Sequence, residues 1–152
     1  MFRGANSLNI DTKGRLAIPS RYRDAIMARS EGHMVVTVNN TRDHCLWLYT
    51  LDEWETVEQK IVALPSFEPN HQKLKRFLIG YASEVDMDKS GRILLPAVLR
   101  DFAVISKEVL LVGQGNKFEI WSEELWNARR SQWLSEEMEL DKLSLEMEQL
   151  SL

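Results

Sequence analysis

The sequence predicts an α+β fold made of two tandem copies of one unit, and three observations support it. First, the residues from Asp11 to Asp24 return from Asp88 to Asp101 at a constant offset, because 88 − 11 and 100 − 23 both equal 77. Second, alternating apolar and polar residues surround a turn in each copy, as they do in β-hairpins. Third, a proline and a predicted helix come next in each copy. Such an internal repeat defines the organisation of this chain of 152 residues.

Each copy begins with a predicted β-hairpin. Residues 11–14 read Asp-Thr-Lys-Gly and residues 88–91 read Asp-Lys-Ser-Gly. Aspartate suits the first position of such a turn because its side chain accepts backbone hydrogen bonds, and glycine suits the last position, where positive φ is common. The residues on either side of each turn alternate between apolar and polar, so we expect the two flanking strands to pair as a hairpin.

An arginine follows each turn and completes an Asp-x-x-x-Arg motif, Asp11/Arg15 in the first copy and Asp88/Arg92 in the second. Strand alternation places each arginine on the face opposite to the apolar residues around it. The aspartate four residues earlier is expected to hold the guanidinium in a salt bridge. The motif therefore predicts two oriented arginines that point away from the core.

Helices and a second pair of strands follow each motif. Pro19 and Pro96 end the hairpins and begin predicted helices over residues 20–29 and 97–104, since proline is favoured in the first helical turn. The next predicted strands are 35–38 and 45–49 in the first copy, and 109–112 and 117–121 in the second.

Trp54 and Trp126 come after these strands and are interpreted as core anchors. They match at an offset of 72, since 126 − 54 equals 72, so the second copy is five residues shorter (77 − 72). Because insertions and deletions are tolerated best in surface loops, we assign this loss to the loop between the second copy's two strands.

The other segments complete the predicted organisation. Pro65 and Pro69 interrupt the region between the copies, and residues 70–79 have the apolar spacing of a helix. We expect a first repeat, a linker helix, a second repeat and an acidic C-terminal helix or tail, over residues 1–60, 61–80, 81–130 and 131–152. The tail is interpreted as a terminal helix partly docked on the core, with a partner surface or an internal decoy for the basic hairpins as alternatives.

Charge is distributed unevenly along the chain. The net charge is −4, yet residues 131–152 carry six acids and one lysine, a balance of −5, so residues 1–130 total +1. Residues 1–23 carry five basic residues and one aspartate, a balance of +4. A basic segment in an acidic protein indicates an anionic partner at the first motif, and a solvated basic face is the alternative.

The residue types of common catalytic and metal sites are sparse. Soft metal ligands are limited to three histidines and Cys45, without Cys-x-x-Cys or His-x-x-x-His spacing. Glycine-rich phosphate loops are absent from the sequence as well. We therefore expect no metal, no cofactor, no small-molecule substrate and no enzymatic activity, and we expect Cys45 to be a small core residue. The lone cysteine and the lack of a signal peptide or long apolar run predict a cytoplasmic protein outside the membrane.

The paired motifs resemble those of the MraZ family. The resemblance rests on the two Asp-x-x-x-Arg hairpins, the N-terminal Met-Phe-Arg-Gly, and the runs Lys-Gly-Arg-Leu at 13–16 and Gly-Arg-Ile-Leu-Leu-Pro at 91–96. It implies two tandem AbrB-like swapped-hairpin repeats that form a pseudo-twofold β-barrel flanked by helices. It also implies a bacterial, nucleoid-associated transcriptional regulator of the division and cell-wall gene cluster. Such a regulator binds short direct repeats of double-stranded DNA in its own promoter as a ring-shaped homo-oligomer.

The motifs and this resemblance indicate two sets of residues. The expected DNA-binding residues are basic and lie in or near the hairpins: Arg3, Lys13, Arg15, Arg23, Lys89 and Arg92. The expected structural residues recur at the offset of 77: Asp11, Gly14, Pro19, Asp88, Gly91 and Pro96. Arg15 is assigned to base-edge readout, because a guanidinium matches O6 and N7 of guanine, while its basic neighbours anchor phosphates. The second turn has fewer basic neighbours, so Arg92 is expected to contribute less than Arg15.

An AbrB-like antitoxin that binds a partner protein through its acidic tail is the alternative function. Antitoxins of that type usually carry one hairpin repeat per chain and complete the fold by pairing two chains. The present sequence carries both halves in one chain, which argues against this alternative.

Overall fold

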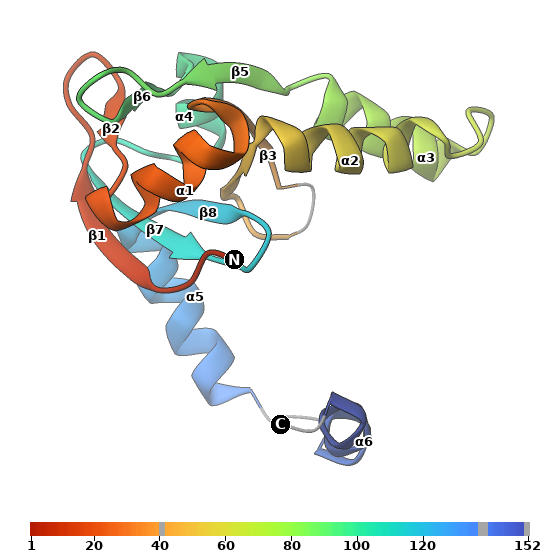
Figure 1. Ribbon diagram of the computed structural model, residues 1–152. Helices are drawn as coiled ribbons and strands as arrows, with labels where there is room; N and C mark the ends of the chain where they lie inside the picture. The colour runs from red at the N-terminus through yellow and green to blue at the C-terminus, as the bar shows by residue number, and fades with distance from the viewer. Residues whose placement is uncertain (40–41, 137–139, 151–152) are drawn as a thin grey trace.

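The computed structural model describes residues 1–39, 42–136 and 140–150, and its strands and helices follow the same order in both halves (Figure 1). The strands are β1 (Ala5–Asn9), β2 (Arg15–Ala17), β3 (His33–Val38), β4 (Leu46–Thr50), β5 (Ser83–Asp86), β6 (Arg92–Leu94), β7 (Glu108–Gly113) and β8 (Phe118–Ser122). The helices are α1 (Ser20–Ser30), α2 (Leu51–Val62), α3 (Pro69–Leu74), the π-helical turn η1 (Lys75–Ile79), α4 (Ala97–Phe102), α5 (Glu123–Ser135) and α6 (Leu140–Leu150).

The described strands form one antiparallel sheet of six strands and one ribbon of two. The sheet runs in the order β1-β7-β8-β4-β3-β5, and the ribbon consists of β2 and β6. Exchanging the two halves of the chain leaves this order unchanged, because β1, β7 and β8 take the places of β5, β3 and β4. The fold is therefore α+β with pseudo-twofold symmetry, as the sequence predicted.

The strand register locates the pseudo-twofold axis. Leu16 pairs with Ile93, its counterpart at the offset of 77, in the middle of the β2–β6 ribbon. Trp47 pairs with Glu119, its counterpart at the offset of 72, where β4 meets β8. The axis passes through both pairs, so the two halves of the chain meet each other at the ribbon and again at the centre of the sheet.

Each predicted hairpin forms its turn but exchanges its strands with the other half. In the first turn, the N–H of Asp11 donates to the carbonyl of Arg15 and the N–H of Gly14 donates to the carbonyl of Asp11, both at 3.0 Å. Beyond the turn, β1 pairs with β7, β2 with β6, and β5 with β3. The expectation that the flanking strands pair with each other was wrong, because a turn sequence reverses the chain without choosing the partner strand. This exchange is the swapped-hairpin arrangement.

The five residues missing from the second copy are lost in two places. Val36 pairs with Leu48 in the first half, and Leu111 pairs with Ile120 in the second. The equivalent positions on β3 and β7 therefore differ by 75 (111 − 36), which leaves three residues (75 − 72) to the loop between the strands. The other two (77 − 75) are lost between the motif and the strand, where α1 has 11 residues and α4 has 6. The assignment of all five to one loop was wrong.

The core lies between the ribbon and the sheet. Leu16 and Ile18 after the first turn, and Ile93 and Leu95 after the second, are fully buried in the same cluster as the apolar residues of the sheet. Burying a side chain of this size contributes about 1.5–3 kcal/mol. Burial of these four residues fixes the ribbon against the sheet. The backbone of the two turns is therefore held in one position.

Tryptophans anchor the helices that follow β4 and β8. Trp54 of α2 is buried against Val35 and lies 5.5 Å from the ring of Tyr49. Trp126 of α5 is half-buried and lies edge-on to Trp121, with ring centroids 5.4 Å apart. The interpretation of Trp54 as a core anchor is confirmed, and Trp126 belongs to a smaller cluster on the second half.

The segments outside the two repeats contain helices in the described part of the chain. α2 continues past residue 60 to Val62, and α3 and η1 together cover the helix predicted over 70–79. In the tail, Trp133 packs against Trp126 with ring centroids 5.5 Å apart, whereas the side chains of residues 145–150 are exposed. No helix in the described ranges combines the length and the apolar character that crossing a membrane requires.

Candidate nucleic-acid interface

The two Asp–Arg turns lie side by side at one corner of the molecule (Figure 1, the loops between β1 and β2 and between β5 and β6). Backbone hydrogen bonds hold them there. The N–H of Ile18 donates to the carbonyl of Gly91 at 2.8 Å, and the N–H of Leu95 donates to the carbonyl of Gly14 at 2.9 Å. Each strand of the ribbon therefore ends against the opposite turn, and the two turns make one composite surface.

The first turn is organised by the carboxylate of Asp11. Its Oδ1 accepts the backbone N–H groups of Lys13 at 3.0 Å and Arg15 at 2.8 Å, and its Oδ2 accepts the Nε–H of Arg15 at 2.8 Å. The two terminal nitrogens of the Arg15 guanidinium make no hydrogen bond to another described residue. Arg15 is thus held at its base by Asp11 and presents a pair of N–H donors that match a two-acceptor partner.

The second turn repeats this geometry. Oδ1 of Asp88 accepts the backbone N–H groups of Ser90 at 2.8 Å and Arg92 at 2.9 Å. Oδ2 of Asp88 accepts the Nε–H of Arg92 at 3.2 Å. The predicted Asp–Arg salt bridge is therefore present in both motifs, and both guanidinium groups are oriented in the same way.

Both aspartates are ionised in the folded protein. The backbone N–H of Arg15 is the main cause that lowers the pKa of Asp11 below its usual value, and its guanidinium lowers that pKa further. The backbone N–H of Arg92 acts in the same way on the pKa of Asp88. A carboxylate whose pKa is lowered by such bonds is a poor general base, so its function here is to position the arginine.

Each turn is also accompanied by an arginine from the other half. The Nε–H of Arg23 donates to the carbonyl of Ile18 at 2.8 Å, and the Nε–H of Arg100 donates to that of Leu95 at 3.1 Å. Arg100 crosses to the first turn, where a Cβ added to Gly14 would lie 2.9 Å from its Cζ.

The mirror contact is made at the second turn, where a Cβ added to Gly91 would collide with the guanidinium of Arg23. Gly14 and Gly91 also have positive φ, +87° and +76°, which L-residues rarely adopt. Glycine is therefore required at both turns for two reasons, its backbone conformation and the close approach of the crossing arginine.

The structure brings most of the predicted residues together. Lys13 and Lys89 are exposed within the turns, and Pro19 and Pro96 are the N-cap residues of α1 and α4. Arg3 is separate from them. It precedes β1 beside Gly113, at the opposite end of that strand from the turn.

Arg100 is the residue that sequence reasoning missed, although it matches Arg23 at the offset of 77. With it, the composite surface gathers six cations around the two aspartates: Lys13, Arg15, Arg23, Lys89, Arg92 and Arg100.

Chemistry other than anion binding has little support in the described residues. No group of three or more histidine, cysteine, aspartate or glutamate side chains in these ranges is arranged to hold a metal ion. Cys45 is fully buried, as predicted, and its burial raises the pKa of the thiol far above its usual value. A thiol of this kind stays protonated and unreactive.

Comparison with known proteins connects this geometry to a family. A family model described as "MraZ protein, putative antitoxin-like" matches two consecutive segments, residues 1–77 and 78–145. A protein of Halorhodospira halophila named Transcriptional regulator MraZ is 50% identical over 153 residues and is covered over 100% of both chains. Proteins of the same name from Legionella pneumophila (strain Corby) and Coxiella burnetii (strain Dugway 5J108-111) are 50% and 48% identical, again over 100% of both chains. The chain therefore belongs to the MraZ family of transcriptional regulators.

Proposed function

We propose that this protein is a sequence-specific DNA-binding regulator that reads short direct repeats in its own promoter through the composite turn surface. The observation that carries the proposal is the pair of Asp-held arginines, side by side and half-exposed, each bound to its aspartate through Nε with the terminal nitrogens left unbonded to other described residues. The names of the relatives support regulation of transcription. The regulated genes are those of the division and cell-wall cluster, and the protein acts on them at the nucleoid.

Arg15 and Arg92 read base edges in this mechanism. The major groove admits a two-stranded β-ribbon, and a guanidinium donates two hydrogen bonds to O6 and N7 of guanine. The β2–β6 ribbon presents both arginines from adjacent turns. Lys13, Lys89 and the crossing arginines lie around them and contact phosphates, which position the ribbon without specifying sequence.

Several copies of the chain act together. One ribbon with two reading arginines spans only a few base pairs, and each good base contact contributes about 1–3 kcal/mol of discrimination. A closed, ring-shaped homo-oligomer presents such ribbons at fixed spacing, and linked contacts raise the overall affinity without any new contact type. Direct repeats in DNA suit a series of identical ribbons with the same orientation.

The deciding experiment is a gel shift with the DNA upstream of the protein's own gene. We expect a discrete complex that is lost when the repeats are scrambled at constant base composition. The logarithm of the binding constant should fall with the logarithm of salt concentration, with a slope of about −0.9 for each phosphate contact. Equal binding to scrambled DNA, or a flat salt dependence, would contradict the proposal.

An antitoxin remains the second candidate because the matching family model is described as antitoxin-like. The strand exchange argues against it, since β1 and β5 of one chain already complete the pairing that two antitoxin chains would supply to each other. Co-purification of a stoichiometric second polypeptide, together with absence of promoter binding, would favour the antitoxin.

A further inference from the structure

The outer face of the β2–β6 ribbon carries two cross-strand pairs of side chains. Arg15 lies directly opposite Leu94, and Arg92 lies directly opposite Ala17. Side chains of directly opposite residues leave the same face of a ribbon, with Cβ atoms about 4.5–5.5 Å apart. The middle pair of the ribbon is fully buried, so the two outer pairs point away from the core. Each Asp-held arginine therefore has one apolar neighbour across the ribbon.

The two apolar neighbours differ in size although the pseudo-twofold axis relates them. Leu94 is the counterpart of Ala17 at the offset of 77, since 94 − 17 equals 77. Leu94 is 55% exposed, whereas the residues on either side of it in the sequence are fully buried. A single exposed leucine is ordinary on a protein surface, and its position directly opposite Arg15 is what gives it meaning. The ribbon therefore presents a bulky apolar group beside one guanidinium and only a methyl group beside the other.

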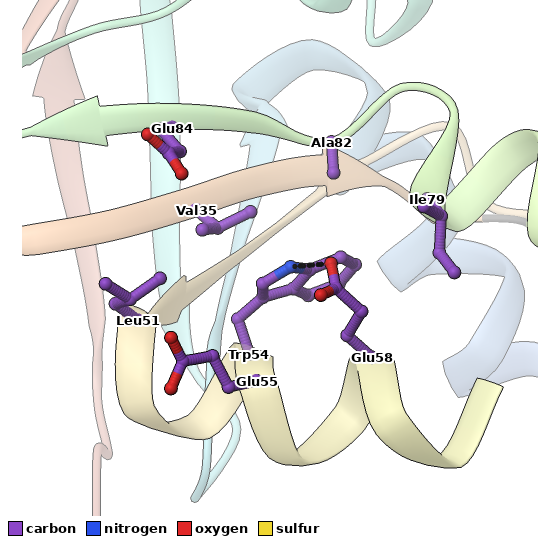
Figure 2. A pocket seen from close by; sticks show the side chains of 8 residues that line it. All are labelled: Val35, Leu51, Trp54, Glu55, Glu58, Ile79, Ala82 and Glu84. Atoms are coloured by element: carbon purple, nitrogen blue, oxygen red, sulfur yellow. Dashed lines mark hydrogen bonds between the residues drawn. The ribbon is translucent and has the colours of Figure 1, made fainter. Parts of the chain in front are cut away.

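The surroundings of Leu94 suit an anionic partner. Its neighbours on the outer face are Arg15, across the ribbon, and Arg92, two residues earlier on the same strand. The hollow of about 240 Å³ between β5 and α2 is the opposite case, because Figure 2 shows its apolar side chains surrounded by acids: Glu55, Glu58 and Glu84. Carboxylates repel phosphates, so that hollow is unsuited to DNA. Of these two surfaces, the ribbon face is the one that fits a nucleic acid.

A leucine beside a base-reading arginine can recognise one type of base. Thymine presents a 5-methyl group in the major groove, whereas cytosine presents an N4 amino group there. An aliphatic side chain buries the methyl group but leaves the amino group without a hydrogen-bond partner. Successive bases lie about 3.4 Å apart along a DNA strand. A side chain whose Cβ lies about 5 Å from that of Arg15 therefore reaches the base pair next to the guanine that Arg15 reads.

We propose that Leu94 determines sequence specificity by contacting the 5-methyl group of a thymine in the base pair next to the guanine that Arg15 reads. Ala17 ends at its Cβ, so no equivalent contact is made beside Arg92. The two halves of the ribbon consequently read different pairs of bases. This inference rests on the proposed function and names a further base that the protein recognises.

Deoxyuridine tests the contact because it lacks the 5-methyl group and keeps the hydrogen-bonding edge of thymine. The probe is the DNA upstream of the protein's own gene, with one thymine of one repeat replaced at a time. Wild type should lose about fourfold in affinity at one thymine, the factor that corresponds to the burial of one methyl group. That thymine should lie in the base pair next to a guanine at which 7-deazaguanine, which lacks N7, also weakens binding.

Leu94→Ala supplies the second half of the test. The variant should bind the unmodified DNA more weakly than wild type and should no longer distinguish thymine from deoxyuridine. Leu134→Ala is the matched control, because it makes the same truncation at an exposed position of α5, and it should keep the wild-type discrimination. Since Leu94 is exposed, Leu94→Ala should keep the melting temperature and the oligomer mass of wild type. A changed oligomer mass would assign Leu94 to a contact between copies and overturn the proposal.

The outcomes separate this inference from the proposed function. Equal wild-type affinity for thymine and deoxyuridine at every position of the repeat would overturn the role of Leu94 and leave the proposed regulator in place. Discrimination that persists in Leu94→Ala would overturn the role as well, because another residue would then contact the methyl group. Absence of specific promoter binding by wild type would instead refute the proposed function, and this inference with it.

Discussion

The turn at Asp11 and the turn at Asp88 have the same hydrogen-bond geometry but different middle residues. In both, the carboxylate accepts the backbone N–H of the third and fifth residues and the Nε–H of the arginine. The third residue contributes only its backbone N–H, so its side chain is free to vary. It is lysine in the first turn and serine in the second. The arginine's orientation therefore depends on aspartate and glycine alone, and the local charge around it is free to differ between the halves.

Replacing Arg15 with alanine should have the largest effect. The change removes one oriented pair of donors, held at the shorter of the two Asp–Arg distances, which costs about 1–3 kcal/mol in each engaged copy. We expect specific binding in the gel shift to be lost while the melting temperature and the oligomer mass stay the same. Arg76→Ala is the control, because it removes an exposed arginine of η1. Unchanged operator affinity in Arg15→Ala would exclude a reading role for this residue.

Arg92→Ala should weaken the same complex by a smaller amount. The Nε–Oδ2 distance is longer in Arg92–Asp88 than in Arg15–Asp11, 3.2 Å against 2.8 Å, so the second guanidinium is held less firmly. Titrations of both variants at one salt concentration give the ranking. If Arg92→Ala loses more affinity than Arg15→Ala, the second turn leads in DNA recognition.

The crossing arginines, Arg23 and Arg100, offer a separate test of the two turns. Because Arg100 lies at the first turn and Arg23 at the second, Arg100→Ala should affect the half-site of Arg15, and Arg23→Ala that of Arg92. Each loss should reduce the salt slope by about 0.9 for every phosphate contact removed. Hydroxyl-radical footprints of the two variants should lose protection at different positions. Loss at the same position would show that the arginines do not act across the two halves.

Gly14→Ala should reduce stability as well as binding. The left-handed conformation costs an L-residue about 1–2 kcal/mol, and the new Cβ would press on the Arg100 guanidinium. A loss of that size lowers the melting temperature by about 2–8 °C in a protein of this length. Ala17→Gly offers a contrasting change at an exposed ribbon position. A Gly14→Ala protein that melts with the wild type would contradict the requirement for positive φ.

The turn carboxylates should give a small dependence of stability on pH. Because the folded pKa of Asp11 and of Asp88 lies below the usual value, their contribution is present above that value and is lost as pH falls through the folded pKa. We expect Asp11→Asn with Asp88→Asn to melt below wild type at pH 7, with a difference that narrows below pH of about 4. Thermal melts across this range test it, and a constant difference would assign the effect to packing.

The local features of the site could be predicted from the sequence. The turn depends on an aspartate at its start and a glycine at its end, and both requirements act within five residues. Strand alternation was enough to direct Arg15 and Arg92 away from the buried Leu16 and Ile93. Even the duplicated architecture is visible, because the two copies are still similar enough to align.

The features that join distant segments could not be predicted in the same way. β1 precedes β2 in the sequence but pairs with β7 in the sheet. Its alternation of apolar and polar residues is compatible with either partner strand. The contacts of Arg100 with Gly14 and of Arg23 with Gly91 depend on that exchange of strands, so the sequence order could not show which turn each arginine accompanies.

The axis through Leu16 and Ile93 has a consequence for how DNA can be read. A ribbon made by two identical chains is the same in both directions, and such a protein matches palindromic sites. Here the two strands belong to one chain, and Lys13 on one side stands opposite Ser90 on the other. The ribbon therefore differs in its two directions, and in the proposed function this asymmetry would let it distinguish a sequence from its reverse complement. A ribbon with two different ends suits the proposed binding of consecutive direct repeats, all in the same orientation.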